Sequence, residues 1–345
     1  MSNGPTGAAP VLQVHPTRRC NLACGHCYTS SGPGATDALG LEVLSGCLDD
    51  AFALGYRQLA VSGGEPLLYA DLAGLLAKAR ALGMLTTMTT NGMLATEGRF
   101  GPLAPLLDLV AISIDGTPDE HDRLRKRQGA FATTVKNLQV IRTSRVPFGF
   151  IFTLTQHNVD SLEFVVRLAA EHGARSVQVH PLTLHGRAAA ELSEERPDET
   201  EIAFALFEAE RLGKKLGVTV RVDAVTSGQL RAHRDEFVPA RPVLDLTSIA
   251  PVLVVEADGN VLPLTHELRP DLRLGSLKWS RLEALARDWL LAGSADTLAE
   301  ACAQTWHELT TPPAMTAVYW FEEVAARTRR GVGIMNIVQE AQLCG

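Results

Sequence analysis

The sequence has few of the features that mark a secreted, membrane-spanning or nucleic-acid-binding protein. No run of about 18 or more apolar residues occurs in the 345-residue chain, so no segment predicts a membrane span. The N-terminus lacks the basic and apolar blocks of a signal peptide. Basic residues number 32 against 39 acidic ones, and the net charge of −7 argues against binding to nucleic acid. These absences predict a cytoplasmic protein with neither a membrane nor a nucleic acid among its partners.

Cysteine is also scarce, and its distribution is uneven. The chain has six cysteines, of which three lie between positions 20 and 27, while Cys47, Cys302 and Cys344 stand alone. Pairing within the group of three would leave one thiol over, and there is no secretory signal. We therefore expect free thiols in a reducing cytosol.

The three clustered cysteines, Cys20, Cys24 and Cys27, have the spacing C-x₃-C-x₂-C. Three thiolates can hold a four-iron cluster and leave one iron without a protein ligand, which is where chemistry would take place. Structural zinc is the alternative, with His26 as a fourth ligand. The short gap between Cys24 and Cys27 disfavours a tetrahedron that includes His26, but the motif by itself leaves both interpretations open.

Up to about residue 182 the sequence alternates between short apolar runs and segments with helical spacing. Strands rich in Val, Ile, Leu and Thr that are separated by helices predict a parallel sheet covered by helices. Six such units are too few for a closed eight-stranded barrel, so we expect an α/β fold with a partial barrel. The expected strands are 11–15, 58–62, 84–90, 109–114, 148–154 and 175–180, and the expected helices are 37–54, 72–82, a segment near Leu103, 119–142 and 162–171.

The alternation ends after a Glu-rich and Ala-rich stretch, residues 191–216, which predicts a long bridging helix. Beyond it the sequence predicts strands at 218–223 and 251–256, an Asp-Gly turn, and helices at 280–291, 296–309 and 315–329. The predicted organisation is a disordered tail at 1–10, a core domain at 11–182, a bridging helix at 183–217 and a second domain at 218–345.

Four polar motifs follow four consecutive predicted strands. The cysteines follow the first strand, Gly63-Gly64-Glu65-Pro66 the second and Thr89-Thr90-Asn91-Gly92 the third, while Ser113-Ile114-Asp115-Gly116 closes the fourth. Taken singly, each of the last three could be an ordinary turn or strand edge. Ligands of parallel α/β folds bind beyond the carboxyl ends of the strands, so the four motifs in succession predict one shared pocket.

With these motifs the chain resembles the radical S-adenosylmethionine (SAM) enzymes, and within that superfamily the SPASM/twitch-type branch. The C-x₃-C-x₂-C spacing and the Gly-Gly-Glu-Pro motif carry the resemblance, which covers residues 11–182 well and 250–277 weakly. It implies a partial (β/α)₆ TIM-like barrel with a C-terminal SPASM/twitch-like α+β extension. It also implies two cofactors, one [4Fe–4S] cluster on the three clustered cysteines and S-adenosyl-L-methionine on its open iron.

The resemblance further implies which residues contact SAM. Gly63, Gly64 and Glu65 are expected to receive the methionyl ammonium, and Arg125 the methionyl carboxylate. Ser113 and Asp115 are expected to contact the ribose, with Asn91 as a nearby polar contact. His26, Val179 and Leu182 are expected to contact the adenine.

The second domain departs from the pattern of the branch. Residues 255–264 and 274–277 resemble its segments, but Leu264 stands where a cysteine would hold an auxiliary cluster. An aliphatic side chain cannot ligate iron. We therefore expect a degenerate SPASM/twitch-like substrate domain, which keeps the shape without auxiliary clusters. Cys47 and Cys302 are expected in the core, and Cys344, next to the last residue, is a candidate hydrogen donor to a substrate radical.

The implied activity is reductive cleavage of SAM to a 5′-deoxyadenosyl radical that abstracts hydrogen from a substrate C–H bond. By analogy with the branch, we expect maturation of a ribosomally synthesised peptide (a RiPP). The alternative is a small-molecule decarboxylase or dehydratase in sugar or nucleoside natural-product biosynthesis. The missing auxiliary ligands favour this alternative, as do the fewer than 20 residues before Cys20, which leave no room for a fused leader-binding domain.

The same activity implies two kinds of partner. Cleavage of SAM requires an external one-electron reductant, of the flavodoxin or ferredoxin type. The substrate is the other partner, and a peptide substrate could come with a separate leader-binding protein.

Overall fold

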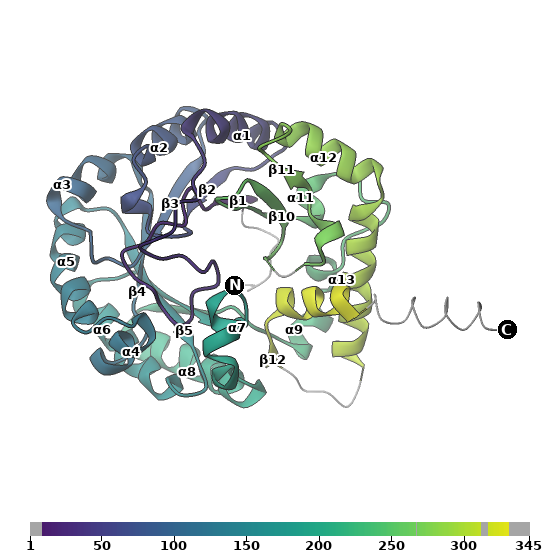
Figure 1. Ribbon diagram of the computed structural model, residues 1–345. Helices are drawn as coiled ribbons and strands as arrows, with labels where there is room; N and C mark the ends of the chain where they lie inside the picture. Colours follow the sequence, from purple (N-terminus) through teal and green to yellow (C-terminus); the bar gives the residue numbers. More distant parts are fainter. Residues whose placement is uncertain (1–8, 267, 312–316, 331–345) are drawn as a thin grey trace.

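Strands and helices alternate through the first half of the chain, as the apolar pattern predicts (Figure 1). The computed structural model describes residues 9–266, 268–311 and 317–330. The strands are β1 (Val11–Val14), β2 (Gln58–Val61), β3 (Leu85–Thr90), β4 (Leu109–Ser113), β5 (Phe148–Leu154), β6 (Ser176–Pro181), β7 (Thr219–Val222), β8 (Val225–Thr226), β9 (Val252–Val255), β10 (Asn260–Pro263), β11 (Gly275–Ser276) and β12 (Ala317–Val318).

The longer helices, among them α1, α2, α5 and α12, lie outside the ring of strands (Figure 1). The helices are α1 (Leu41–Ala53), α2 (Leu72–Ala81), α3 (Glu97–Phe100), α4 (Pro118–Arg125), α5 (Ala130–Ser144), α6 (Leu162–His172), α7 (Arg187–Glu191), α8 (Glu199–Leu216), α9 (Ser227–Ala232), α10 (Arg234–Phe237), α11 (Leu246–Ile249), α12 (Leu282–Leu291) and α13 (Ser294–Thr310). The chain is helical again at residues 320–330, later than the expected start at 315, because β12 intervenes.

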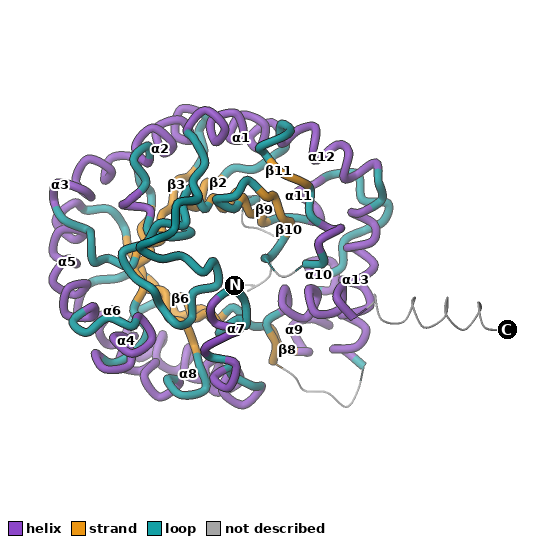
Figure 2. The backbone as a smooth tube through the Cα atoms, viewed as in Figure 1, coloured by secondary structure: helices purple, strands orange, loops and turns teal. Residues whose placement is uncertain are grey.

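One large sheet organises the described part of the chain, in the order β11-β10-β9-β1-β2-β3-β4-β5-β6-β7. Every neighbouring pair from β1 to β7 is parallel. Each of these connections passes through at least one helix on the outside of the curved sheet (Figure 2). The parallel sheet and the partial barrel that the sequence predicts are therefore confirmed.

Strands from the C-terminal part extend this sheet at its other edge. β9 is parallel to β1, with Val255 opposite Val14, and β10 and β11 continue the sheet in antiparallel fashion. β7 closes the opposite edge against β6. The division into a core at 11–182 and a second domain at 218–345 stays a prediction. Strands from beyond residue 182 nevertheless stand at both edges of the sheet that carries the first six.

The two faces of the sheet differ in polarity. The side chains packed between strands and helices are apolar and wholly buried, as Val61, Ile112 and Val177 illustrate. The residues that alternate with them point to the other face, and there Gln13 and Gln178 are only half-buried. The barrel thus has a polar inner wall, which is the side on which a polar ligand could lie.

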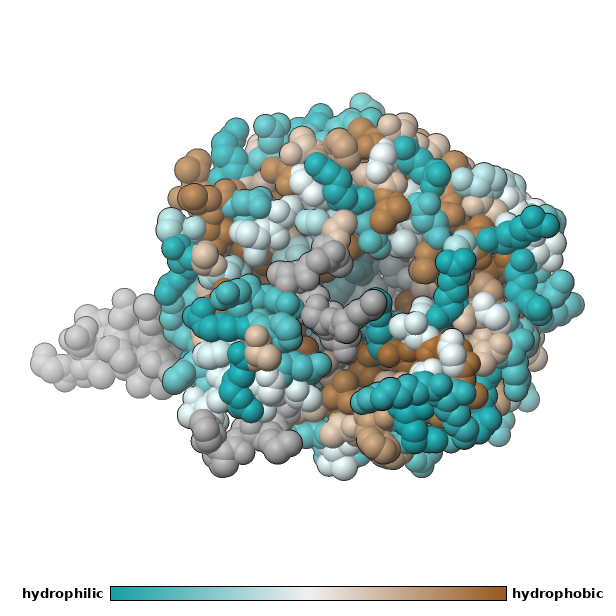
Figure 3. Space-filling model, turned by 180° about the vertical axis from the view of Figure 1, so that it is seen from behind, coloured by the Kyte–Doolittle hydropathy of each residue, from teal (hydrophilic) through white to brown (hydrophobic). Residues whose placement is uncertain are grey.

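The outer surface is largely hydrophilic in the view of Figure 3, and apolar residues appear there in separate patches. Exposed large apolar side chains include Phe207 on α8 and Trp279, just before α12. Among the described helices, none is both long enough and apolar enough to cross a membrane.

The prediction of one long helix at 191–216 is wrong at its start, because the chain forms two separate helices, α7 and α8, in this region. Pro197 precedes the N-cap of α8, where the chain is extended rather than helical. Asp198 then caps α8: its carboxylate accepts a hydrogen bond from the Thr200 N–H at 2.6 Å, and its own N–H donates to Glu201 at 2.8 Å. α8 is therefore the crossover helix between β6 and β7.

A buried carboxylate links α1 to the C-terminal part of the chain. Asp50 accepts hydrogen bonds from Arg281 Nε at 2.9 Å, from Arg281 Nη2 at 2.5 Å and from the Glu283 N–H at 3.3 Å. Burial would raise the pKa of Asp50, but the bonds from Arg281 outweigh burial and hold the pKa below its usual range. The stabilisation is therefore present above the unfolded-state pKa of about 3.9 and is lost as the pH falls below it.

Asp50→Ala should lower the free energy of unfolding by about 1–3 kcal/mol near neutral pH, because bonds to a charged group are lost. Asp49→Ala is the matched control: Asp49 lies on the same helix, more exposed, and pairs with Lys78 at 2.6 Å. We expect a change of about 0–1 kcal/mol for the control. Urea unfolding measures both, and the difference should shrink toward about pH 3. Equal effects at neutral pH would contradict this link.

Candidate active site

The clustered cysteines lie in an irregular segment that follows β1, residues 15–40, which we call the cysteine loop. Backbone bonds fold this loop back on itself. The Cys20 N–H donates to the Gly32 carbonyl at 3.1 Å, and the Gly32 N–H donates to the Arg18 carbonyl at 3.1 Å. The loop is thus an ordered structure, although it contains no regular helix.

The end of β2 packs backbone to backbone against the cysteine loop. The Gly64 N–H donates to the Thr17 carbonyl at 2.9 Å, and the Glu65 N–H donates to the Arg19 carbonyl at 2.9 Å. A Cβ added at Gly64 would lie 2.9 Å from the carbonyl carbon of Arg18, with the Arg19 oxygen nearer still. Any side chain at position 64 would push the two segments apart, which gives the Gly-Gly motif its structural reason.

The cysteine sulfurs have hydrogen-bond donors aimed at them. Cys20 and Cys24 are buried and Cys27 is half-buried. The Leu22 N–H donates to Cys20 Sγ at 3.4 Å, and the Ser31 N–H donates to Cys27 Sγ at 3.3 Å. A neutral thiol is a weak acceptor, whereas hydrogen bonds to sulfur are a regular feature of thiolates that ligate iron–sulfur clusters.

Burial favours the neutral thiol over the thiolate at Cys20 and Cys24. It raises the pKa of Cys20 to about 12 and also raises the pKa of Cys24. Because thiols must lose their protons to ligate iron, cluster binding has to release them. Three thiols gathered in one loop, with donors already directed at two sulfurs, fit a [4Fe–4S] cluster.

The zinc alternative needs four ligands around a single ion. Within the residues that the structure describes, no three Cys, His, Asp or Glu side chains are arranged to hold one ion. The candidate fourth ligand, His26, has its Nε2 3.7 Å from Asp115 Oδ2. The structure thus offers the zinc interpretation no support.

The carboxylate of Glu65 is enclosed by the protein, with the residue 0 % exposed. Oε1 accepts from the Leu67 N–H at 3.1 Å and from the Thr90 hydroxyl at 2.7 Å, and Oε2 accepts from the Asn91 N–H at 3.0 Å. Burial raises the pKa of Glu65, and these donors oppose that rise. Glu65 therefore joins the ends of β2 and β3, and its direct contact with the methionyl ammonium stays a prediction.

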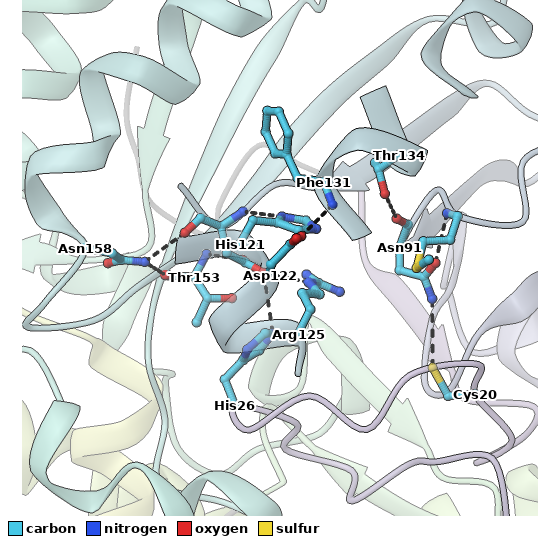
Figure 4. Close-up of polar contacts among 12 residues, drawn as sticks. Cys20, His26, Asn91, His121, Asp122, Arg125, Phe131, Thr134, Thr153 and Asn158 are labelled. Carbon is cyan, nitrogen blue, oxygen red and sulfur yellow. Dashed lines mark hydrogen bonds and ion pairs between the residues drawn. The ribbon is translucent and has the colours of Figure 1, made fainter. Parts of the chain in front are cut away.

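Asn91 connects the end of β3 to the cysteine loop (Figure 4). Its Nδ2 donates to Asn21 Oδ1 at 2.9 Å and lies 3.9 Å from Cys20 Sγ. Its Oδ1 accepts from the Met93 N–H at 3.0 Å, and its carbonyl accepts from the Thr134 hydroxyl at 2.9 Å. Asn91 is thus held beside a cluster ligand, where a polar contact near the cofactors was expected.

Asp115 and Arg125, which the resemblance assigns to different ends of SAM, bond to each other. Asp115 Oδ2 accepts from Arg125 Nε at 2.7 Å, and Oδ1 accepts from the Thr153 N–H at 3.1 Å. Asn158 Nδ2 donates to the Asp115 carbonyl at 3.2 Å. Burial alone would raise the pKa of Asp115, but the charge of Arg125 outweighs it and holds the pKa well below its usual range.

This buried ion pair bears on two expected SAM contacts, and both stay predictions. Asp115 is 0 % exposed, both of its carboxylate oxygens have protein donors, and it positions Arg125. A contact of Asp115 with a ribose stays a prediction. Arg125 is close enough to Cys24 for its charge to lower the pKa of that thiol, against the larger effect of burial. The pairing of Arg125 with the methionyl carboxylate stays a prediction.

The remaining predicted contacts fall in different places. Ser113 ends β4 and is buried. Val179 is wholly buried in the main core, and its neighbour His180 is half-buried. The adenine contact expected of Val179 stays a prediction. Leu182 packs against Leu124 in a small separate apolar cluster.

Four aromatic rings lie together at the cysteine loop, a group that the sequence did not predict. His266 stacks on His15 with ring centroids 5.2 Å apart and on His185 at 6.0 Å, and it lies 4.8 Å from the Tyr28 ring. Glu256 Oε1 bonds to His266 Nδ1 at 3.1 Å. The one usable signal in the sequence was that His15 closes a predicted strand and Tyr28 follows the last clustered cysteine.

A strained turn brings His266 to this group. Leu264 has a φ of 63°, and the Thr265 N–H donates to the Pro263 carbonyl at 2.7 Å, which closes a γ-turn. A positive φ at a residue other than glycine costs about 1–3 kcal/mol. The Leu264 side chain is buried in the core. The position at which an iron-ligating cysteine would stand in the branch is therefore an apolar packing position.

The three single cysteines differ in what the structure says of them. Cys47 of α1 and Cys302 of α13 are buried in the core, as expected, and burial raises the pKa of each to about 12. Cys344, the candidate hydrogen donor, lies outside the described residues.

A comparison with protein families matches residues 14–169 to the Radical SAM superfamily. Residues 14–169 are a radical SAM domain. The match contains the cysteine loop and strands β2 to β5. The sequence-based assignment of this region to the radical SAM superfamily is thereby confirmed.

Two curated relatives and one solved structure show how far the similarity extends beyond the radical SAM domain. The PqqA peptide cyclase of Ruegeria pomeroyi is 35% identical over 190 residues, 53% of this chain and 50% of that protein. The Fe-coproporphyrin III synthase of Methanosarcina barkeri is 30% identical over 188 residues, 54% of this chain and 47% of that protein. This chain thus spans about half the length of these relatives.

The solved structure is native anSMEcpe with bound AdoMet and Kp18Cys peptide. It superimposes with a TM-score of 0.62 over 95% of this chain and 99% of that chain, at 17% identity. Similarity at this level shows the fold, and here it extends past the radical SAM domain through the C-terminal extension.

Glu65→Gln should loosen the site as a whole, because the amide would turn a donor toward one of the N–H or O–H groups that the carboxylate now accepts from. We expect a lower iron content after anaerobic reconstitution and a loss of about 1–3 kcal/mol in the free energy of unfolding. Glu42→Gln, in the first turn of α1 and exposed, is the control. If iron content and stability stayed intact and only SAM affinity fell, the structural role of Glu65 in joining the two strand ends would be wrong.

Proposed function

We propose that this chain is a radical SAM enzyme that binds one [4Fe–4S] cluster through Cys20, Cys24 and Cys27 and SAM at the open iron. When bound and reduced, the cluster supplies the electron that cleaves SAM to methionine and a 5′-deoxyadenosyl radical, which takes hydrogen from a substrate C–H bond. The observation that carries the proposal is the cysteine loop, in which N–H groups are aimed at two of the three sulfurs.

The strand ends around this loop would bind and orient SAM. Arg125 is held by Asp115 near Cys24, where it would pair with the methionyl carboxylate. Backbone carbonyls at Gly63 and Gly64 would accept hydrogen bonds from the methionyl ammonium. Ser113 would contact the ribose and His26 the adenine. The protein's part is to position the cofactor and keep water from the radical.

We further propose that the substrate is a peptide. The names of the relatives support this, since one is a peptide cyclase and the structural neighbour was solved with a peptide bound. The half-buried polar inner wall of the barrel, including Gln13 and Gln178, would face it. A small molecule is the second candidate, which the similarity to Fe-coproporphyrin III synthase favours. The electron would come from a flavodoxin-type or ferredoxin-type reductant.

The cluster assignment predicts about four irons per chain after anaerobic reconstitution. With dithionite and SAM, the loaded protein should form 5′-deoxyadenosine and methionine without added substrate. Joint replacement of Cys20, Cys24 and Cys27 by alanine should abolish both iron binding and cleavage. Cys47→Ala and Cys302→Ala are matched controls in the buried core, and both should keep about four irons.

Two outcomes would contradict this proposal. Iron and sulfide retained by the triple variant would mean that other residues hold a cluster. A fully loaded, reduced protein that forms no 5′-deoxyadenosine would defeat the assigned reaction itself.

The substrate class can be tested with any short peptide that is encoded beside the gene. Incubation with SAM and reductant should change the mass of such a peptide, or leave its mass unchanged in water and add about one dalton in D₂O if the reaction is an epimerisation. A gene neighbourhood of sugar or nucleoside enzymes, together with peptides that stay unmodified, would favour the small-molecule candidate.

A further inference from the structure

Arg187, which the sequence did not single out, binds the cysteine loop at three carbonyl groups. Its Nη1 donates to the Cys24 carbonyl at 2.8 Å, and its Nη2 donates to the Ser31 carbonyl at 2.7 Å. Its backbone N–H donates to the Cys27 carbonyl at 2.9 Å. One residue from the segment after β6 thus fixes the carbonyls of two cluster ligands and of the residue whose N–H points at Cys27 Sγ.

Gly186 allows this segment to come so close. Its φ of 57° and ψ of −130° are a conformation that residues with a side chain rarely adopt. A Cβ added there would lie 2.8 Å from the carbonyl oxygen of Cys27, with the Tyr28 oxygen nearer still. Glycine at position 186 and arginine at position 187 therefore act together, and we call the pair the clasp.

The helix that begins with Arg187 is itself fixed in place. Ala188 and Leu192 pack with Leu124 of α4 and with Leu182 in a small apolar cluster. Glu191 and Lys126 form an ion pair between the same two segments. The clasp is therefore anchored to α4 by its own packing and ion pair, and the Gly25 N–H of the cysteine loop donates to the Leu124 carbonyl of the same support at 2.9 Å.

Helix electrostatics do not explain an arginine at this position. The first turn of a helix presents unpaired N–H groups, which favour an anion and disfavour a cation. Arg187 is half-buried there, and its guanidinium is directed at carbonyl oxygens of the loop. A fork of N–H donors can hold two such oxygens in one fixed geometry, which the single ammonium of lysine cannot do.

We propose that the clasp, Gly186 and Arg187, positions Cys24 and Cys27 before iron arrives, so that the loop need not become ordered at the moment of cluster binding. A preorganised loop binds more tightly because less conformational freedom is lost on binding. Arg187 is accordingly a positioning residue for the cluster. This inference rests on the proposed function, which supplies the cluster that the loop would hold.

The test uses the full chain with Arg187→Ala, Arg187→Lys and Gly186→Ala. In the metal-free protein, amide hydrogen exchange of residues 20–32 should be about tenfold faster in the alanine variants, since two or three hydrogen bonds are lost. In the reconstituted protein, iron should be lost to a chelator about tenfold faster. Arg187→Lys should fall between, and exchange in β2 to β5 should stay unchanged in all three.

Two controls match the variants in chemistry. Arg123→Ala removes an arginine of α4 that bonds to Glu195 at 2.7 Å, away from the loop carbonyls. Gly98→Ala adds a Cβ where nothing lies within 4 Å. Neither should change exchange in the loop or the rate of iron loss. The electron paramagnetic resonance signal of the reduced cluster should broaden in Arg187→Ala and not in Arg123→Ala, because the ligand positions become heterogeneous.

If folded Arg187→Ala showed unchanged hydrogen exchange in the cysteine loop and unchanged iron retention, the positioning role of the clasp would be overturned. If the alanine variants do not fold, the same two measurements on Arg187→Lys decide, and wild-type values there would overturn it as well. Failure of the proposed function looks different: the unmodified chain would then take up no iron. Exchange in the metal-free loop still tests the clasp in that case.

Discussion

The cysteine loop contains few regular backbone pairings, and the buried N–H and C=O groups of such a segment must find partners elsewhere in the protein. Partners for the loop backbone come from the ends of two strands, the backbone of Gly64 after β2 and Arg187 after β6, and the side chain of Asn91 after β3 bonds to the Asn21 side chain of the loop. Parallel strands end at the same edge of a sheet, so the fold delivers all three to one place. The geometry of the site therefore depends on the register of the sheet, and the sheet depends on its alternating buried strands.

The C-terminal extension is part of this arrangement. β9 pairs with β1, the strand that leads into the cysteine loop, and the buried bonds of Asp50 hold α12 against α1. Past β10, the strained turn at Leu264 places His266 against His15 and Tyr28. Where relatives of the branch would place a metal ligand, this chain has an apolar packing residue followed by an imidazole. That ring lies next to the cysteine loop, where a substrate would approach the radical.

Much of the fold could be predicted from the sequence, because strands such as β2 and β5 carry strong local patterns and clear turn signals. The strand ends also gave the location of the site. Contacts between segments that are distant in the sequence could not be predicted, because no local pattern encodes them. β7 lies beyond the predicted boundary but pairs with β6, and Pro197 moves the start of α8. The pairing of Asp115 with Arg125 depends on contacts across the loop after β4, and Arg187 has the sequence context of an ordinary exposed charge.

The central claim is that three cysteines hold a four-iron cluster whose remaining iron binds SAM. Mössbauer spectroscopy of the ⁵⁷Fe-reconstituted protein tests it directly, because it resolves the coordination of the separate irons. Addition of SAM should change the parameters of about a quarter of the iron, since one iron in four gains new ligands while three keep their thiolates. A spectrum that SAM leaves unchanged in all four irons would contradict the account.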